Sequence, residues 1–508
     1  MFSKQLSKDN VLRWLAFTFI ALAVLISYYP SIYYSPRADQ VIYMAETVNI
    51  HHPWDLIIGC YDHNRHRTIG PGDELLFRPL LYVILGSEQV LFGHHFWAWQ
   101  LLGVLAHLTL IWVLLRLLWH LSHPWLAFAG AWIFALSVVN YELVTWPHLS
   151  SYVLMMVCIV CSIEQVIFCL EKNELPWKTT LRLLIYFFIA CFIYETANIF
   201  VLLLTALLFI SFPKLRGRVL LLTTPVILYL LFSVFNYTVI NHMAFSFTGS
   251  AKGMMLWKSI QDIFYLAWWW LYEGMFNGMY HYVMVIRTMF QSSEVMFLKP
   301  LALYNPQVFL ELVILTVFLD MAWFSRWDLL KRIKVLIVLL GMLFSYVGVI
   351  VLGRSQEMGS LAATVRVNSY FSYIFWVLVL IIAFLLIPVK SVTTKLQQWV
   401  IIIFVTACLL SGLWQGVRIH GMAVRYSGET NVNVVLIRTL DLLIQEKKSD
   451  PGFSFYVDPR YPGNYPYGTI RKVDDPPGKK YTFIELLYPQ YFYPKQIAKY
   501  KFLIQEIN

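Results

Sequence analysis

The sequence predicts an all-α polytopic membrane protein with a small α+β region at its C-terminal end. Its 508 residues are 59% hydrophobic and only 13% charged, whereas soluble domains carry roughly 25% charged residues. Long apolar runs recur along the chain, and the lysines and arginines fall in short clusters between these runs. The net charge of +10 therefore has the distribution of an orientation signal for membrane insertion. These observations exclude an ordinary soluble domain and predict no nucleic-acid partner.

About eleven apolar segments are predicted to span the membrane, whose hydrocarbon core is roughly 30 Å thick. The stretch from 181 to 212 is too long for one helix and is interrupted at Tyr194, Glu195 and Thr196, so we predict two short spans there. The other predicted spans cover residues 11–29, 99–119, 124–140, 149–170, 219–240, 301–324, 333–353, 369–389 and 398–417.

The basic clusters orient these spans. With the amino terminus in the cytoplasm, every cluster falls on the cytoplasmic side, as the positive-inside rule requires. The clusters contain Lys4, Lys8, Arg116, Lys172, Lys178, Arg182, Lys214, Arg216, Arg218, Arg326, Lys331, Arg332, Lys334, Lys390 and Lys395. We therefore expect a multi-pass protein of the plasma (inner) membrane, with its carboxyl terminus on the extracytoplasmic side.

The predicted topology leaves four segments of residues 1–420, the transmembrane domain, on the external side. They are the first loop at 30–98, the turn at 141–148, the loop at 241–300 and the segment at 354–368. The loop at 241–300 is rich in tryptophan and tyrosine, which favour the bilayer interface, so we expect helices lying on the outer leaflet there.

The C-terminal region, residues 421–508, differs in composition because charges, tyrosines and prolines become frequent. Residues 433–444 have the apolar spacing of a helix, and residues 453–457 have the pattern of a strand. These patterns predict a small extracytoplasmic α+β region. At this size the region needs the membrane domain or a partner to complete its core.

Short motifs in the transmembrane domain follow one another in a recognisable order. Phe-Arg-Pro-Leu-Leu-Tyr at 77–82 and Leu-Phe-Gly at 91–93 precede a helix that contains His107. Glu-Leu-Val-Thr-Trp follows at 142–146, and Tyr-Glu-Thr-Ala at 194–197. Together with the later Arg354 and Arg366, these motifs resemble the protein mannosyltransferase-like branch of the GT-C superfamily of membrane glycosyltransferases.

The resemblance implies an inverting hexosyl- or pentosyltransferase. Its donor is a sugar on a polyprenyl phosphate in the membrane lipid, and its acceptor is a hydroxyl of a lipid, a glycan or a protein. Asp39, in the first external loop, is the candidate catalytic base that deprotonates this hydroxyl. It is flanked by Ala38 and Gln40, so it stands as a single acid, as in the lipid A aminoarabinose transferases. The alternative role for Asp39 is a helix N-cap.

Arg78, Arg354 and Arg366 are the candidate phosphate-binding residues, because a guanidinium offers a planar, permanently charged fork to phosphate oxygens. The alternative for each is an arginine at the interface that contacts lipid headgroups.

Glu142, His148 and Glu195 are the other candidate substrate-binding residues, since they lie at or near the outer ends of predicted spans. Each glutamate could orient the acceptor, hold a metal with Asp39, or pair with an arginine as scaffold. Glu164 lies within an apolar run, and we predict that it pairs with a residue of another helix.

Histidines and aspartates are dense in the first external loop, but their spacing matches no zinc pattern. They are His51, His52, His63, His66, His94 and His95, with Asp55, Asp62 and Asp73. We predict solvated loop residues and assign neither a cofactor nor metal ligands, while a divalent cation stays the open alternative.

Two other classes of protein share this composition. One is a polytopic lipid or glycan transporter or flippase, and the other is a noncatalytic scaffold with a GT-C-like fold. A transporter normally places paired acids and broken helices near the middle of the membrane. The acids and arginines singled out above instead gather at the external face, which favours the glycosyltransferase.

Overall fold

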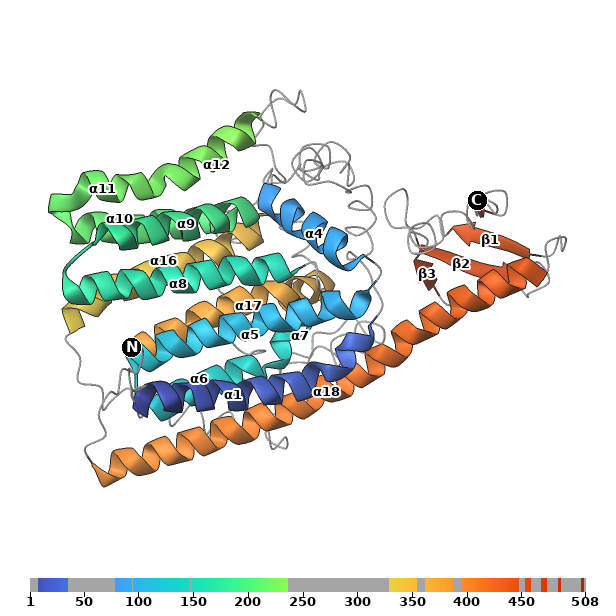
Figure 1. Ribbon diagram of the computed structural model, residues 1–508, viewed down its shortest axis with the longest axis horizontal. Coiled ribbons are helices and arrows are strands. Elements are labelled where there is room, and N and C mark those ends of the chain that lie inside the picture. Colours follow the sequence, from blue (N-terminus) through green and yellow to red (C-terminus); the bar gives the residue numbers. More distant parts are fainter. Residues whose placement is uncertain are drawn as a thin grey trace, which may run out of the picture. The chain divides into compact units, whose positions relative to one another are not determined.

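A computed structural model shows an α-helical chain that carries several helices long and apolar enough to cross a membrane (Figure 1). The chain divides into two compact units, one of residues 1–29 and 102–421 and the other of residues 30–101 and 422–508. The structure describes residues 8–34, 78–93, 95–146, 149–235, 329–353, 361–386, 394–446, 453–457, 467–472, 483–485 and 504–506.

The first unit is a bundle in which helices run side by side (Figure 1). Its helix pairs α8 with α9, α10 with α16, α16 with α17, and α1 with α6 pack together. Two helices, α5 and α18, continue past the limits of this unit. The helices are α1 (Lys8–Tyr28), α5 (Phe96–Leu121), α6 (Pro124–Ala135), α7 (Tyr141–Thr145), α8 (Ser150–Lys172), α9 (Trp177–Ile193), α10 (Thr196–Ser211), α11 (Arg216–Leu220), α12 (Thr224–Phe235), α16 (Leu329–Gly353), α17 (Leu361–Leu386) and α18 (Lys395–Glu446). Short 3-10 turns join some of them, namely η2 (Val138–Asn140), η4 (Pro213–Leu215) and η5 (Leu221–Thr223).

The described part of the chain contains six helices with the length and composition of a membrane span. The number rises to seven if the bent pair formed by α6 and the segment Val138–Thr145 is one span. Large apolar side chains such as Trp14, Leu231 and Trp399 are exposed on these helices, as expected of surfaces that contact lipid tails. The chain is thus a polytopic α-helical membrane protein, and the full count of about eleven spans stays a prediction. The predicted span at 301–324 lies outside the described residues.

The predicted interruption of the stretch from 181 to 212 is confirmed. Helix α9 ends at Ile193, α10 begins at Thr196, and Glu195 occupies the N-cap position of α10. The span predicted over 124–140 contains a break that was not predicted. Helix α6 ends at Ala135, and the chain resumes as η2 and α7 after a bend of 49°. The expected turn at 141–148 therefore begins with the short helix α7.

Helix α18 joins two helices that the sequence analysis kept apart. It runs for 52 residues, from Lys395 to Glu446, through both the span predicted at 398–417 and the helix predicted at 433–444. The residues between them contain glycine but no proline. A glycine costs a helix only about 1 kcal/mol, so nothing in this stretch forces the helix to end.

Small residues allow close approach inside the first unit. A Cβ atom added to Gly103 of α5 would lie 2.5 Å from the carbonyl oxygen of Val144 in α7. One added to Gly130 of α6 would lie 2.7 Å from the ring of Phe384 in α17. Packing through glycine is a common way for helices to associate within a membrane.

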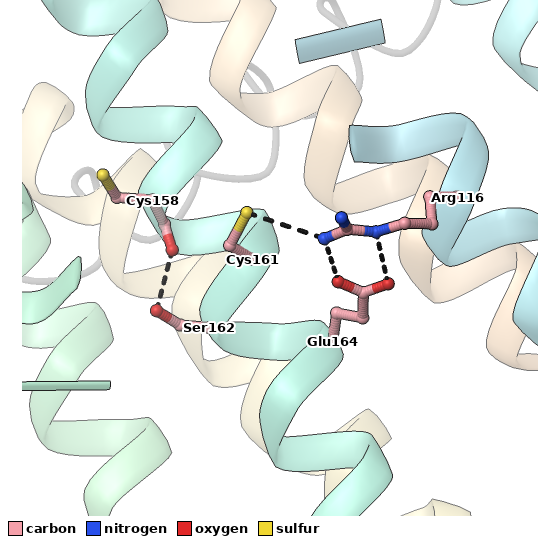
Figure 2. Close-up of polar contacts among 5 residues, drawn as sticks. All are labelled: Arg116, Cys158, Cys161, Ser162 and Glu164. Carbon is pink, nitrogen blue, oxygen red and sulfur yellow. Dashed lines mark hydrogen bonds and ion pairs between the residues drawn. The ribbon is translucent and has the colours of Figure 1, made fainter. Parts of the chain in front are cut away.

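Two polar pairs connect α5 with α8 near their C-terminal ends. Figure 2 shows one of them, Arg116 with Glu164. The guanidinium of Arg116 donates to both carboxylate oxygens of Glu164, with Nε 2.7 Å from Oε1, and Nη2 also lies 3.9 Å from Sγ of Cys161. One turn further along α5, Nε2 of His120 lies 2.7 Å from Oε2 of Glu171. The predicted interhelical pairing of Glu164 is confirmed.

The second unit contains helix α4 (Pro79–Phe92), the 3-10 turn η1 (Tyr29–Tyr33) at its boundary, and a four-stranded sheet in the order β3-β2-β1-β4. In this sheet β1 pairs antiparallel with β2 and parallel with β4, and β2 pairs antiparallel with β3. The strands are β1 (Phe453–Val457), β2 (Tyr467–Lys472), β3 (Phe483–Glu485) and β4 (Ile504–Glu506).

Candidate functional site

The described part of the chain includes three of the candidate site residues with their side chains, namely Arg78, Glu142 and Glu195. Arg366 lies in helix α17, although its side chain is outside the described part. Asp39, His148 and Arg354 lie outside the described residues altogether. Glu142, Glu195 and the residues around them form the described part of the candidate site in the first unit.

Glu142 is held by the short helix α7, which packs against α17. The glutamate is half-buried in the first turn of this helix, while the neighbouring Tyr141 is buried. The ring of Tyr141 stacks on that of Tyr28, at the end of α1, with 6.3 Å between the ring centroids. This aromatic contact fixes α7 against the end of α1. Glu142 itself remains partly exposed.

Glu195 is placed by the junction of α9 and α10. It is half-buried at the N-cap position of α10, where the positive end of the helix dipole stabilises a carboxylate. The preceding Tyr194 is buried and packs edge-on against Tyr152 in the first turn of α8, with 5.0 Å between the ring centroids. This contact holds the start of α8 beside the start of α10.

Glu142 and Glu195 lie at the same end of the first unit, although more than fifty positions separate them in the sequence. Helices α1 and α9 end there, and α7, α8 and α10 begin there (Figure 1). The pair Arg116–Glu164 lies toward the opposite end, where α5 and α8 finish. We call the end that carries Glu142 and Glu195 the acidic end of the bundle.

Buried polar groups also gather at the acidic end. Ser151, Thr196 and Asn198 are buried within the first turns of α8 and α10. Among the described residues, the hydroxyl oxygens of Ser151 and Thr196 and the side-chain oxygen of Asn198 accept or donate no hydrogen bond. Such groups carry a free-energy cost unless water or a ligand satisfies them.

Arg78 belongs to the second unit. It directly precedes α4, whose first residue is Pro79, and its carbonyl oxygen accepts a hydrogen bond from the amide of Tyr82 at 3.4 Å. Only 8% of Arg78 is exposed. Arginine is rarely buried to this extent unless it is paired.

Polar contacts that the sequence did not predict lie at the break between α6 and α7. Nε2 of His107 lies 3.0 Å from the carbonyl oxygen of Ala135, and its Nδ1 lies 2.8 Å from the hydroxyl oxygen of Tyr373. The side-chain amide of Asn140 donates to the carbonyl of Phe134. The backbone amide of Val138 donates to Oε1 of Gln415 at 3.1 Å. The only sequence signal for these contacts is that His107, Asn140 and Gln415 are polar residues within or beside apolar runs.

Metal binding finds no support in the part of the chain that the structure describes, where no three His, Cys, Asp or Glu side chains group as ligands. The histidine-rich loop and Asp39 lie outside that part, so the divalent-cation alternative is not tested.

Comparisons with protein-family models, with curated proteins and with solved structures found no match to this chain.

Proposed function

We propose that the protein is an integral membrane glycosyltransferase of the inverting GT-C type. It would move a sugar from a polyprenyl-phosphate donor to a hydroxyl acceptor of a lipid, a glycan or a protein. The single observation that carries the proposal is the placement of Glu142 and Glu195. These acids belong to two motifs distant in sequence, and both lie in elements that meet at one end of the bundle.

The proposed reaction follows from the chemistry of the donor, which already carries a phosphate leaving group. Asp39 takes the proton from the acceptor hydroxyl as its oxygen attacks the anomeric carbon. The bond between that carbon and the phosphate oxygen breaks, and the electron pair leaves on the phosphate. Arg78, Arg354 and Arg366 would stabilise this charge. Glu142, His148 and Glu195 would orient the acceptor.

The acidic end would face the extracytoplasmic side. Arg116, Lys172, Arg216 and Arg218 all lie in segments at the other end of the bundle, which the positive-inside rule assigns to the cytoplasm. With about eleven spans, the amino terminus is then cytoplasmic, and residues 421–508 form an extracytoplasmic α+β region of this plasma-membrane protein.

The broken span formed by α6 and α7 favours a second candidate, a lipid or glycan transporter, because transporters use such breaks to bind their substrates. In transporters the freed backbone groups bind the ligand or the coupling ion. Here the carbonyls of Phe134 and Ala135 and the amide of Val138 are bound by side chains of the protein itself. Because these backbone groups are already bound within the protein, the break favours the glycosyltransferase over the transporter.

The test is a transfer assay with the full-length protein in nanodiscs. A set of radiolabelled polyprenyl-phosphate hexoses and pentoses serves as donors, and a total membrane-lipid and glycan extract serves as acceptor. Asp39→Asn should lower the rate of transfer by about 10²- to 10⁴-fold without loss of expression, because the change keeps the shape of the side chain and removes its basicity. Asp9→Asn, in the first turn of α1 at the opposite end, is the matched control and should keep wild-type transfer.

Transfer by the Asp39→Asn variant at the wild-type rate would show that another group is the base. Absence of transfer by the wild-type protein with every donor would contradict the proposed function.

A further inference from the structure

The break between α6 and α7 frees backbone groups inside the bundle. Helix α6 ends at Ala135, and the chain turns by 49° before η2 and α7 continue it. At such a break the last carbonyls and the first amides lose their partners within the helix. In an apolar interior each group left unsatisfied costs several kcal/mol. A break at this depth is stable only if other groups bind them.

Three buried side chains from three parts of the chain do so. His107 comes from α5, Asn140 from the break itself and Gln415 from α18, and they bind the Ala135 carbonyl, the Phe134 carbonyl and the Val138 amide. His107 and Asn140 are fully buried, and Gln415 is 3% exposed. Together with the backbone hydrogen bond from the Ser137 amide to the Phe134 carbonyl, 3.3 Å long, these side-chain bonds hold the break in one geometry.

His107 links the break to a further helix. Its Nε2 carries the hydrogen, because the carbonyl oxygen of Ala135 can only accept a hydrogen bond. In the neutral ring Nδ1 is then an acceptor and receives the hydroxyl hydrogen of Tyr373 in α17. Helix α17 itself packs against η2 and α7. The imidazole therefore joins α5, the end of α6 and α17.

We propose that His107 is a positioning residue, which holds α7 and its Glu142 in one orientation at the acidic end by binding the carbonyl of Ala135. Its importance for sugar transfer rests on the proposed function. The fixed orientation of α7 does not, because it follows from the hydrogen bonds alone.

Amide hydrogen exchange of the full-length protein in nanodiscs tests the orientation of α7 without any substrate. His107→Phe keeps a ring but removes both hydrogen bonds, so exchange in residues 138–146 should become at least about tenfold faster, as expected for loss of a buried hydrogen bond. His107→Gln keeps an amide hydrogen near the position of Nε2 and should restore exchange to near the wild-type rate. Ser162→Ala removes a buried hydrogen bond of α8, from Oγ to the Cys158 carbonyl, and should leave residues 138–146 unchanged.

Gln415→Met is the second variant, because it frees the amide of Val138 without changing His107. It should also accelerate exchange in residues 138–146. If exchange there stays within twofold of the wild-type rate in His107→Phe, the proposal is wrong, whatever the result for Gln415→Met. Equal acceleration over the whole chain in both variants would likewise overturn it, because the two residues would then support the fold in general.

The link to function has a separate readout. In the transfer assay His107→Phe should lower kcat at least tenfold with little change in the KM for the donor, and His107→Gln should recover most of kcat. A wild-type protein that transfers no sugar would refute the proposed function and leave the exchange result standing. Normal kcat in a His107→Phe variant with accelerated exchange would refute only the role of His107 in the reaction.

Discussion

Arg116 and Glu164 illustrate how single residues carry charge within an apolar helix pair. The guanidinium fork binds both carboxylate oxygens, which compensates for the partial loss of hydration of the two groups (Figure 2). The sequence could predict that Glu164 has a partner, because an acid in an apolar run is costly alone. It could not name Arg116, since nothing in the sequence gives the rotation of α5 against α8.

Glu164→Gln should destabilise the protein by about 1–3 kcal/mol, because it leaves the half-buried guanidinium with a neutral partner. Glu171→Gln is the matched control on the same helix. Its pair with His120 is more exposed, so the loss should be less than about 1 kcal/mol. Thermal unfolding in detergent measures both, and equal melting temperatures for wild type and Glu164→Gln would contradict the stabilising role of the pair.

Among the candidate site residues, Glu142 and Glu195 could be predicted at the ends of spans because each acid directly follows or interrupts a long apolar run. The structure confirms that they share one end of the bundle. The roles of His107 and Gln415 could not be predicted in the same way. Each bonds to a backbone group of a helix that is distant in sequence, and periodicity carries no record of such contacts.

At the scale of elements, the two helix breaks differ in how strongly the sequence signals them. Glu195 interrupts an apolar stretch that is too long for one span, so both length and charge indicate the break before α10. The break after α6 falls in a run of ordinary span length, where Ser137 and Asn140 are neutral and compatible with a helix. Local sequence therefore determines the break before α10, and tertiary hydrogen bonds determine the break after α6.

The contact of α5 with α7 depends on Gly103, which faces the backbone carbonyl of Val144. Gly103→Ala should destabilise the protein by about 1–3 kcal/mol, because a backbone atom cannot move aside as a flexible side chain can. Gly217→Ala in α11 is the matched control, since an added Cβ atom there meets nothing within 4 Å. It should be neutral or stabilising by up to about 1 kcal/mol. Thermal unfolding distinguishes the two, and a stabilised Gly103→Ala variant would show that the helices do not pack so closely.

At the scale of the whole molecule, composition and charge clustering were sufficient to predict a polytopic helical membrane protein, because the bilayer accepts few other structures. The six described helices with the character of spans agree with that prediction. Helix ends and the continuity of α18 were less predictable, since a helix rich in neutral residues continues until a proline, a cap or a tertiary contact stops it.

The orientation in the membrane is testable by cysteine labelling of intact cells, in a background with the native Cys60 replaced by serine. With the amino terminus in the cytoplasm, Lys479→Cys in the C-terminal region should react with an impermeant maleimide. Lys214→Cys in η4 should react only after the membrane is opened. The reverse pattern would place the acidic end in the cytoplasm and exclude an extracytoplasmic reaction.

The central claim is that the acidic end of the bundle is where the sugar meets its acceptor, and photo-crosslinking of a radiolabelled polyprenyl-phosphate sugar tests it most directly. The photoreactive group is placed on the sugar, and the labelled peptides of the full-length protein are mapped by mass spectrometry. The account predicts label in residues 138–152 or 193–199, around Glu142 and Glu195, and competition by unlabelled polyprenyl phosphate. Label confined to the opposite end, in residues 113–124 or 164–177 around Arg116 and Glu164, would contradict it.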